Sequence, residues 1–254
     1  MTDSVWNLAG THAQLESPRL VVAFDLSHPE EGIGGVEVAT HPHTTRIPLD
    51  ARLLRVVSER ANWRWEGVTE GYVRGADLIA NYGPASAPAL LPQIYWRWIS
   101  PTGHSVGGIE AVISMQTLLL EDTPTLVSSM QMAMTELLQG SSGSHPAFTP
   151  VSVSGHATLG LTREHGAGLF LCRSADADLS YLIMVHPTDY ESVEIARLGG
   201  DRFDLRFQLF PERLEKGVIR RGRLRGVFLP RTGDEAAAGT AYAEFLQSPP
   251  PLTT

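Results

Sequence analysis

Apolar and polar residues alternate along much of the chain, and a period of two is typical of β-strands with one buried face. The clearest example is 202–209, in which phenylalanine and leucine alternate with charged or amide side chains. Residues 179–185 are instead apolar almost throughout, as expected for a central strand covered on both faces. Helical spacing is rare. Only 234–246, which begins at Asp234 as a predicted cap and contains three consecutive alanines, predicts a helix.

Turns rich in glycine, proline and serine separate the remaining alternating segments. In chain order, we expect strands at 20–26, 34–40, 46–49, 53–57, 61–66, 71–82 (with a break at Gly75), 91–99, 109–119, 125–134, 151–154, 156–163, 168–172, 179–185, 193–196, 202–209 and 218–229. Residues 1–18 have a mixed pattern and are expected to form an irregular lead-in.

The segment 125–134 fits two descriptions. Its leucines and methionines match helical spacing, with Asp122 or Thr123 as a cap and Gly140 as a stop. Its alternation also mirrors that of 109–119 across a short loop. We prefer a strand because of this mirrored alternation.

So many short strands with so little helix predict an all-β fold, a large antiparallel two-layer sandwich with a short C-terminal helix. The Gly- and Ser-rich stretch at 140–147 is the best candidate for an internal break. We interpret it as a surface loop between two β-rich halves, so that residues 1–254 form a single domain.

Composition and charge narrow the function classes. The 254 residues are 43% apolar, enough for a sizeable core, and carry a net charge of −8, which argues against nucleic acid and anionic membranes. No apolar run approaches the roughly 20 residues that span a bilayer. Cys172 is the only cysteine, which excludes an internal disulfide and a cysteine-based zinc site. The lack of a secretory pattern at the N-terminus favours the cytoplasm.

Two Trp-Arg-Trp triplets hold most of the tryptophans. In a strand, each triplet places two indoles on one face and an arginine on the other. The indoles either fill a thick core or form a platform on which a sugar ring stacks. In the second interpretation Arg64, Arg97, Asp77 and Asn81 would be the polar partners. The candidate ligand-binding indoles are those of Trp63, Trp65, Trp96 and Trp98.

Arginines gather near the C-terminus. Residues 197–231 contain nine arginines and Lys216 against four carboxylates, a balance of +6, so the remainder carries −14. If 202–209 pairs with 218–229, several guanidiniums share one face and could bind a small anion. The alternative is a solvated face crossed by weak surface ion pairs. The candidate anion-binding residues are Arg206, Arg221, Arg223 and Arg225.

Histidines offer the last candidate chemistry. His104, His156 and His186 lie at predicted strand ends, with Glu110 and Glu164 nearby in sequence, and a His–Glu pair could perform acid–base work. His156 is retained as a candidate ligand-binding residue. His41 and His43 are separated by a proline and have no nearby carboxylate, so we predict no metal site. No phosphate-binding, dinucleotide-binding or H-E-x-x-H motif occurs, and we expect no cofactor.

The order of elements, with a late long strand and a terminal helix, resembles the galactose mutarotase-like supersandwich proteins. The resemblance is one of architecture. The resemblance implies a carbohydrate-related ancestry. No stretch matches the catalytic histidine and glutamate motifs of the sugar epimerases, so we assign no catalytic residue from the resemblance. Two hypotheses follow. Either the protein binds or modifies a carbohydrate, such as an acidic sugar, or it is a non-catalytic structural or protein-interaction module without a small-molecule substrate.

Overall fold

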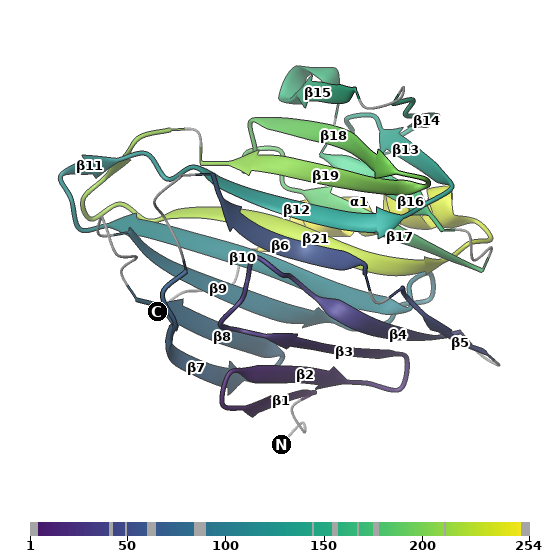
Figure 1. Cartoon of the computed structure of the whole chain (residues 1–254). Helices are drawn as coiled ribbons and strands as arrows, with labels where there is room; N and C mark the ends of the chain where they lie inside the picture. The colour runs from purple at the N-terminus through teal and green to yellow at the C-terminus, as the bar shows by residue number, and fades with distance from the viewer. Residues whose placement is uncertain are drawn as a thin grey trace.

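The computed structural model describes residues 5–40, 43–48, 50–59, 65–83, 90–143, 145–153, 157–166, 168–174, 178–210 and 212–249. Two β layers face each other in this part of the chain (Figure 1). Neighbouring strands within both layers are antiparallel. The predicted all-β sandwich with one C-terminal helix is confirmed.

One layer is a nine-stranded sheet. Its order is β14 (Phe148–Pro150), β13 (Glu136–Gly140), β16 (Leu169–Arg173), β17 (Leu179–Val185), β21 (Arg220–Pro230), β10 (Gly107–Thr117), β9 (Leu90–Ile99), β8 (Asp77–Tyr82) and β7 (Val68–Arg74). We call the face of this sheet that is turned toward the other layer its inner face, and the opposite one its outer face.

The other layer consists of two five-stranded sheets. The first has the order β1 (Trp6–Ala9), β2 (His12–Glu16), β3 (Leu20–Asp25), β4 (Gly34–Thr40) and β5 (His43–Arg46). The second has the order β15 (Thr158–Thr162), β18 (Ser192–Gly199), β19 (Arg202–Leu209), β12 (Leu126–Ala133) and β6 (Arg52–Ser58). A single bridge between Ile33 and Leu53 joins them. A short ribbon of β11 (Glu121–Asp122) and β20 (Leu214–Glu215) and a 3-10 turn at Arg163–His165 complete the connections.

The main core lies between the layers. Trp96 and Trp98 of β9 point into it from the nine-stranded sheet, and Leu205, Phe207 and Leu209 of β19 point into it from the opposite layer. The rings of Phe170 and Phe207, one from each layer, lie 6.0 Å apart edge to face. Alternation along each strand thus buries one set of large side chains in a common core.

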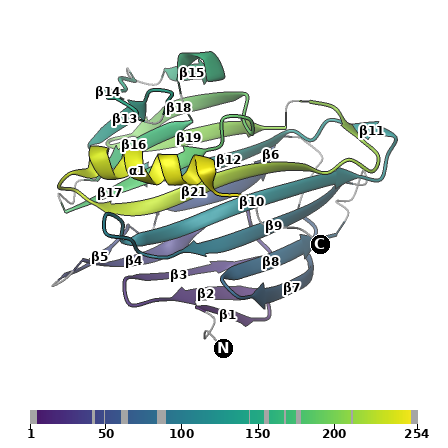
Figure 2. The same cartoon turned by 180° about the vertical axis from the view of Figure 1, so that it is seen from behind.

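A second, smaller core covers part of the outer face. Figure 2 shows the helix α1 (Asp234–Gln247) lying over β16, β17 and β21. Tyr242 and Phe245 of α1 pack there on Leu171, Leu182 and Val227. Gly233 precedes the helix with a left-handed backbone (φ 77°), which glycine adopts readily, and it occupies the cap position that the sequence suggested for Asp234. Asp234 is instead the first helical residue.

The structure settles the local predictions for 125–134 and for Gly75. The preference for a strand at 125–134 is confirmed, because β12 pairs with β6 and β19. The break at Gly75 is also confirmed, as a turn between β7 and β8. The segment 140–147 joins β13 and β14, which pair with each other within one sheet.

Other local predictions are wrong. Residues 6–16 form β1 and β2 with Trp6 and Leu15 buried, not an irregular lead-in; their polar outer positions hid the pattern. The strand predicted at 46–49 is wrong, because β5 ends at Arg46 and residues 47 and 48 lie outside any strand. The strand predicted at 151–154 is also wrong, because residues 151–153 follow β14 outside any strand. Trp65 and Glu66 are not in a strand, and the rest of the predicted strand at 61–66 lies outside the described residues.

Candidate functional site

The outer face of the nine-stranded sheet carries three rows of side chains that run across neighbouring strands. Residues directly opposite one another in antiparallel strands lie on the same face, so the pairing register defines each row. The charged row is Arg74, Asp77, Arg97, Glu110 and Arg225; the middle row is Tyr72, Ile79, Tyr95, Val112 and Arg223; the amide row is Glu70, Asn81, Gln93, Ser114 and Arg221.

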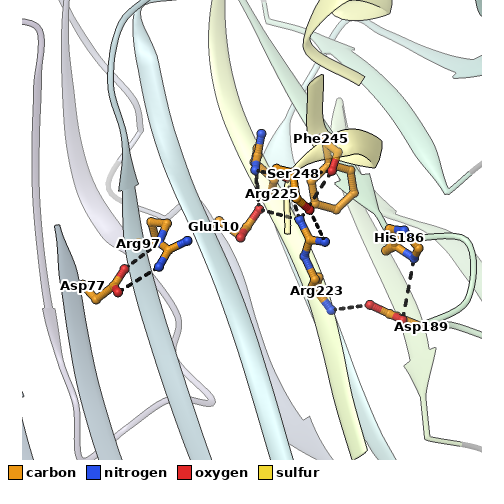
Figure 3. Close-up of polar contacts among 9 residues, drawn as sticks. All are labelled: Asp77, Arg97, Glu110, His186, Asp189, Arg223, Arg225, Phe245 and Ser248. Atoms are coloured by element: carbon orange, nitrogen blue, oxygen red, sulfur yellow. Dashed lines mark hydrogen bonds and ion pairs between the residues drawn. The ribbon is translucent and has the colours of Figure 1, made fainter. Parts of the chain in front are cut away.

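Signs alternate along the charged row. Arg97 donates two hydrogen bonds to Asp77, from Nε to Oδ1 at 2.7 Å and from Nη2 to Oδ2 at 2.9 Å. These bonds raise the pKa of Arg97. On the next strands, Glu110 accepts from Nε and Nη2 of Arg225 at 2.8 and 2.6 Å (Figure 3). The Arg97–Asp77 fork joins two nitrogens to two oxygens and so fixes side-chain orientation as well as contributing energy, whereas both nitrogens of Arg225 reach the same oxygen, Oε2.

Arg223 and Arg225 connect the sheet to the end of the helix. Arg223 donates to the Ser248 carbonyl at 2.9 Å and to the Ser248 hydroxyl at 2.8 Å, and Arg225 reaches the same hydroxyl at 3.0 Å. Both guanidiniums lie 4.9 Å from the centre of the Phe245 ring. Cations are favourable at a helix C-terminus, where carbonyls lack helical partners. Through these contacts both arginines hold α1 on the sheet.

Glu110 completes this cluster from below the helix. Its carboxylate is 1% exposed and lies 3.5 Å from Nη2 of Arg223 as well as contacting Arg225. A carboxylate that is buried and held by two guanidiniums is out of reach of a ligand. The cluster is therefore a structural joint between sheet and helix.

His186 lies beside the same joint (Figure 3). Its Nδ1 lies 2.8 Å from the Thr188 hydroxyl and 3.8 Å from Oδ1 of Asp189. Asp189 also accepts a 3.0 Å hydrogen bond from the backbone N–H of Arg223. The imidazole meets the Phe245 ring edge to face at 6.1 Å. These contacts give His186 a packing role next to the helix end.

A second cluster holds the start of α1. Arg173 donates to both carboxylate oxygens of Asp234, at 2.9 and 3.0 Å, and Ser180 and Arg231 add bonds of 2.6 and 2.8 Å. Burial alone would raise the pKa of Asp234, but the hydrogen bonds from Arg173, Ser180 and Arg231 lower it below the ordinary value. The ionised carboxylate is thus the form that the fold stabilises.

This shift predicts a pH dependence of stability. Because the folded pKa of Asp234 lies below its unfolded value, its contribution is present above about pH 4 and is lost as the pH falls through the folded pKa. We expect the free energy of unfolding, measured by urea titration, to fall less steeply below about pH 4 in Asp234→Asn than in the wild type. Asp201→Asn, at an exposed ion pair, should keep the wild-type slope. A wild-type slope in Asp234→Asn would contradict the assignment.

The amide row borders a polar pocket on this face. A pocket of about 420 Å³ is lined by Asn81, Tyr82, Leu91, Pro92, Gln93, Ser114, Met115, Gln116 and Ile219. Gln93 Nε2 donates to Asn81 Oδ1 at 2.6 Å, and Asn81 Nδ2 donates to Glu70 at 2.8 Å. This chain of bonds fixes which way both amides point.

Ser114 lies opposite Gln93 on the neighbouring strand but is not part of that chain of bonds. It is 5% exposed, and its Oγ has no hydrogen-bond partner among the described residues. A buried hydroxyl without a partner costs about 1–3 kcal/mol, so such groups are rare. Ser114 also lines the pocket.

The predicted indole platform is not formed by the described tryptophans. Trp96 and Trp98 are 2% and 9% exposed and fill the core between the layers. Trp65 is half-buried, donates from Nε1 to the Val56 carbonyl at 3.1 Å and meets Tyr82 edge to face. Trp63 and His156 lie outside the described residues.

The predicted pairing of 202–209 with 218–229 is wrong. Strand β19 pairs with β12 and β18, whereas β21 pairs with β10 and β17 in the opposite layer. Both strands bury an apolar face in the same core, one from each layer. The chain leaves β19 at Phe210, which has a left-handed backbone (φ 54°). Arg206 consequently pairs with Glu59, far from the other three arginines.

The structure brings together Arg221, Arg223 and Arg225 on β21, but in different roles. Arg223 and Arg225 bind the helix end. Arg221 ends the amide row opposite Ser114 and also lines a smaller pocket of about 60 Å³ with Arg163 and Arg220. Sequence reasoning missed Gln93, Ser114 and Gln116. These residues lie on the strand face opposite Trp96 and Ile113. That placement could have identified them only after Trp96 and Ile113 had been assigned to the core.

Metal and thiol chemistry find no support in the described part of the chain. No group of three or more His, Cys, Asp or Glu side chains there could hold a metal ion. Cys172 is fully buried, and burial raises the pKa of its thiol. Among the described residues, no helix has the length and apolar character needed to cross a membrane.

Comparison with known proteins identifies the fold. No family model and no curated protein sequence matches the chain. Among solved structures, the Slr1438 protein from Synechocystis sp. PCC 6803 superposes with a TM-score of 0.60 at 10% identity, covering 88% of this chain and 99% of that one. A candidate aldose 1-epimerase from Escherichia coli K12 gives 0.54 at 9% identity, covering 88% and 97%.

A third similar structure is part of a larger enzyme. An α-N-acetylgalactosaminidase from Bifidobacterium bifidum gives a TM-score of 0.54 at 13% identity, covering 86% of this chain and 36% of that one. Identities this low establish architecture and leave activity open. The chain has the galactose mutarotase-like supersandwich fold.

Proposed function

We propose that this protein binds a carbohydrate in the pocket of the amide row. The observation that carries the proposal is the buried, unpartnered hydroxyl of Ser114 in the pocket wall. A sugar presents hydroxyl groups that both donate and accept hydrogen bonds. Serine and amide side chains offer the same two capacities. The pocket therefore matches the chemistry of a sugar ring better than that of an apolar ligand.

The size and shape of the pocket support the same proposal. Its volume of about 420 Å³ lies within the range of small-molecule sites. Leu91, Pro92 and Ile219 supply apolar wall on which the C–H face of a sugar can rest, while Gln93 and Gln116 supply polar groups. An acidic sugar would also bring its carboxylate near Arg221, which lies opposite Ser114.

The fold context agrees with the proposal without carrying it. Two of the similar structures are described as a candidate aldose 1-epimerase and an α-N-acetylgalactosaminidase, both proteins that act on sugars. The buried carboxylate of Glu110 is held by arginines, so we propose binding rather than a reaction. A non-catalytic interaction module is the alternative, and it requires no sugar affinity at all.

Substitution of Ser114 by alanine tests the proposal. Because the hydroxyl is buried without a partner, we expect Ser114→Ala to leave the free energy of unfolding unchanged or to raise it by up to about 1 kcal/mol. The same change should weaken sugar binding about tenfold, the equivalent of one good hydrogen bond. Calorimetric titration with a panel of neutral and acidic monosaccharides and their methyl glycosides measures the affinity; urea unfolding measures the stability.

Ser128→Ala is the matched control. Ser128 is equally buried, but its hydroxyl donates to the Arg55 carbonyl at 2.9 Å in the other layer. Its loss should destabilise the protein by about 1–3 kcal/mol and leave the affinity unchanged. The proposal fails if no sugar of the panel binds at millimolar concentration, or if Ser114→Ala binds as tightly as the wild type.

A further inference from the structure

An exposed apolar patch stands at one end of the sandwich. Five large aliphatic side chains there are 40–84% exposed, and we call them the apolar tip: Leu118, Leu119, Leu120, Val218 and Ile219. They lie on the two connections that lead into and out of the β11–β20 ribbon, which projects beyond the long strands (Figures 1 and 2). Clustered exposure of this kind marks a contact surface more often than scattered single residues do.

Hydrogen bonds from backbone N–H groups stabilise the two connections of the apolar tip. The backbone N–H of Lys216 donates to the Leu120 carbonyl at 3.0 Å, which ties the two connections together. The N–H of Val218 donates to the Glu215 carbonyl at 3.0 Å, and that of Leu119 donates to the Thr117 hydroxyl at 3.2 Å. These bonds hold the backbone that carries the exposed side chains.

The tip continues into the pocket of the amide row. Ile219 belongs to both, because it is half exposed and also lines the pocket. Gln116, another lining residue, precedes Leu118 by two positions at the end of β10. A ligand seated in the pocket therefore meets polar groups at one end and a wholly aliphatic surface at the other.

The chemistry of the tip limits what can cover it. Aliphatic side chains offer neither hydrogen bonds nor aromatic stacking to a further sugar ring. At its rim Arg213 pairs with Glu121 and Arg220 with Glu212. With Asp122, Glu215 and Lys216 included, four carboxylates face three cationic side chains, a balance of −1, so the rim does not attract an anionic lipid surface. The exposed apolar area is on the order of 400 Å², about half of what one partner buries in a stable protein interface. A short apolar chain fits this surface better than a second protein.

We propose that the ligand is amphiphilic, a sugar that carries an alkyl or similar apolar group at one end. The sugar occupies the pocket, and the apolar group lies along Ile219 toward Leu118 and Leu120. This inference rests on the proposed carbohydrate binding and adds the class of sugar derivative. Each methylene that leaves water on the tip adds to affinity without changing the contacts in the pocket.

Matched pairs of glycosides test the inference. Calorimetric titration compares methyl and octyl β-glucoside, and methyl and octyl β-galactoside, each below the concentration at which micelles form. We expect the octyl compound of the recognised sugar to bind at least about tenfold more tightly than the methyl compound. The double variant Leu118→Ser/Leu120→Ser should lose most of this advantage and bind the methyl compound as the wild type does. Both residues are exposed and lie outside the pocket, so the fold should be retained.

Leu198→Ser is the control for unspecific contact with alkyl chains. Leu198 is 49% exposed, close to the value for Leu118, but lies on β18 at the opposite end of the sandwich. It should keep the full octyl advantage. Equal affinities for methyl and octyl compounds would overturn the inference and leave carbohydrate binding intact. An octyl advantage that survives in the double variant would also overturn it. So would a wild-type protein that shows no preference for the octyl compounds and self-associates, if the double variant abolishes that self-association. Failure of every glycoside to bind would remove the proposed function itself.

Discussion

Replacement of Glu110 by alanine is expected to lower the free energy of unfolding by about 3–5 kcal/mol. The side chain is 1% exposed and is the carboxylate shared by Arg223 and Arg225. Its removal leaves two guanidiniums buried beneath the helix end without their counter-charge, and the cost of burying them is no longer offset. Urea unfolding followed by circular dichroism measures the loss.

Glu37→Ala provides the comparison for this prediction. Glu37 also pairs with an arginine, Arg46, but both side chains are well exposed, so its loss should cost less than about 1 kcal/mol. If Glu110→Ala is no more destabilising than Glu37→Ala, the cluster does not hold α1 to the sheet. Replacement of all three members by apolar residues of similar size should recover most of the stability.

Replacement of Trp96 by alanine is the second large effect, with an expected cost of about 3–5 kcal/mol. The indole is 2% exposed and packs against Phe24 of the opposite layer, with ring centroids 5.2 Å apart. Its loss leaves a cavity that rigid strands cannot fill. Thermal and urea unfolding measure the change.

This substitution also separates the two interpretations of the Trp-Arg-Trp triplet. An indole in the core stabilises the protein and makes no contact with a ligand, so the affinity of the folded variant for sugar should change little. A stable Trp96→Ala protein that has lost sugar binding would mean that the indole is part of a platform after all.

The sequence predicted most strands because each buries one face, and alternation records that directly. It did not predict which layer each strand joins, because both layers share one core and their strands have the same pattern. The arginines illustrate the limit. Arg206 and Arg223 alternate with apolar neighbours in the same way, yet β19 and β21 lie in opposite layers. Only pairing partners, which are distant in sequence, decide this.

The candidate site was even harder to predict from the sequence than the layers were. Asn81, Gln93 and Ser114 come from three strands and meet because of register alone. A shift of one residue would turn each of them to the inner face. Ser114 is buried without a hydrogen-bond partner in the described part of the chain because of the strands around it, and the sequence pattern does not show which strands those are. The indoles, by contrast, were conspicuous in the sequence and are part of the core.

A crystal structure with a bound sugar would show whether the amide-row pocket is the binding site. Crystals would be soaked with the glycoside that binds best in the calorimetric panel. We expect the sugar ring in the pocket between β8, β9 and β10, with one of its hydroxyls within hydrogen-bond distance of Ser114 Oγ and another near the amide of Gln93. A sugar bound elsewhere, for instance in the pocket formed by Asn7, His12 and Gln14 on the opposite layer, would contradict it.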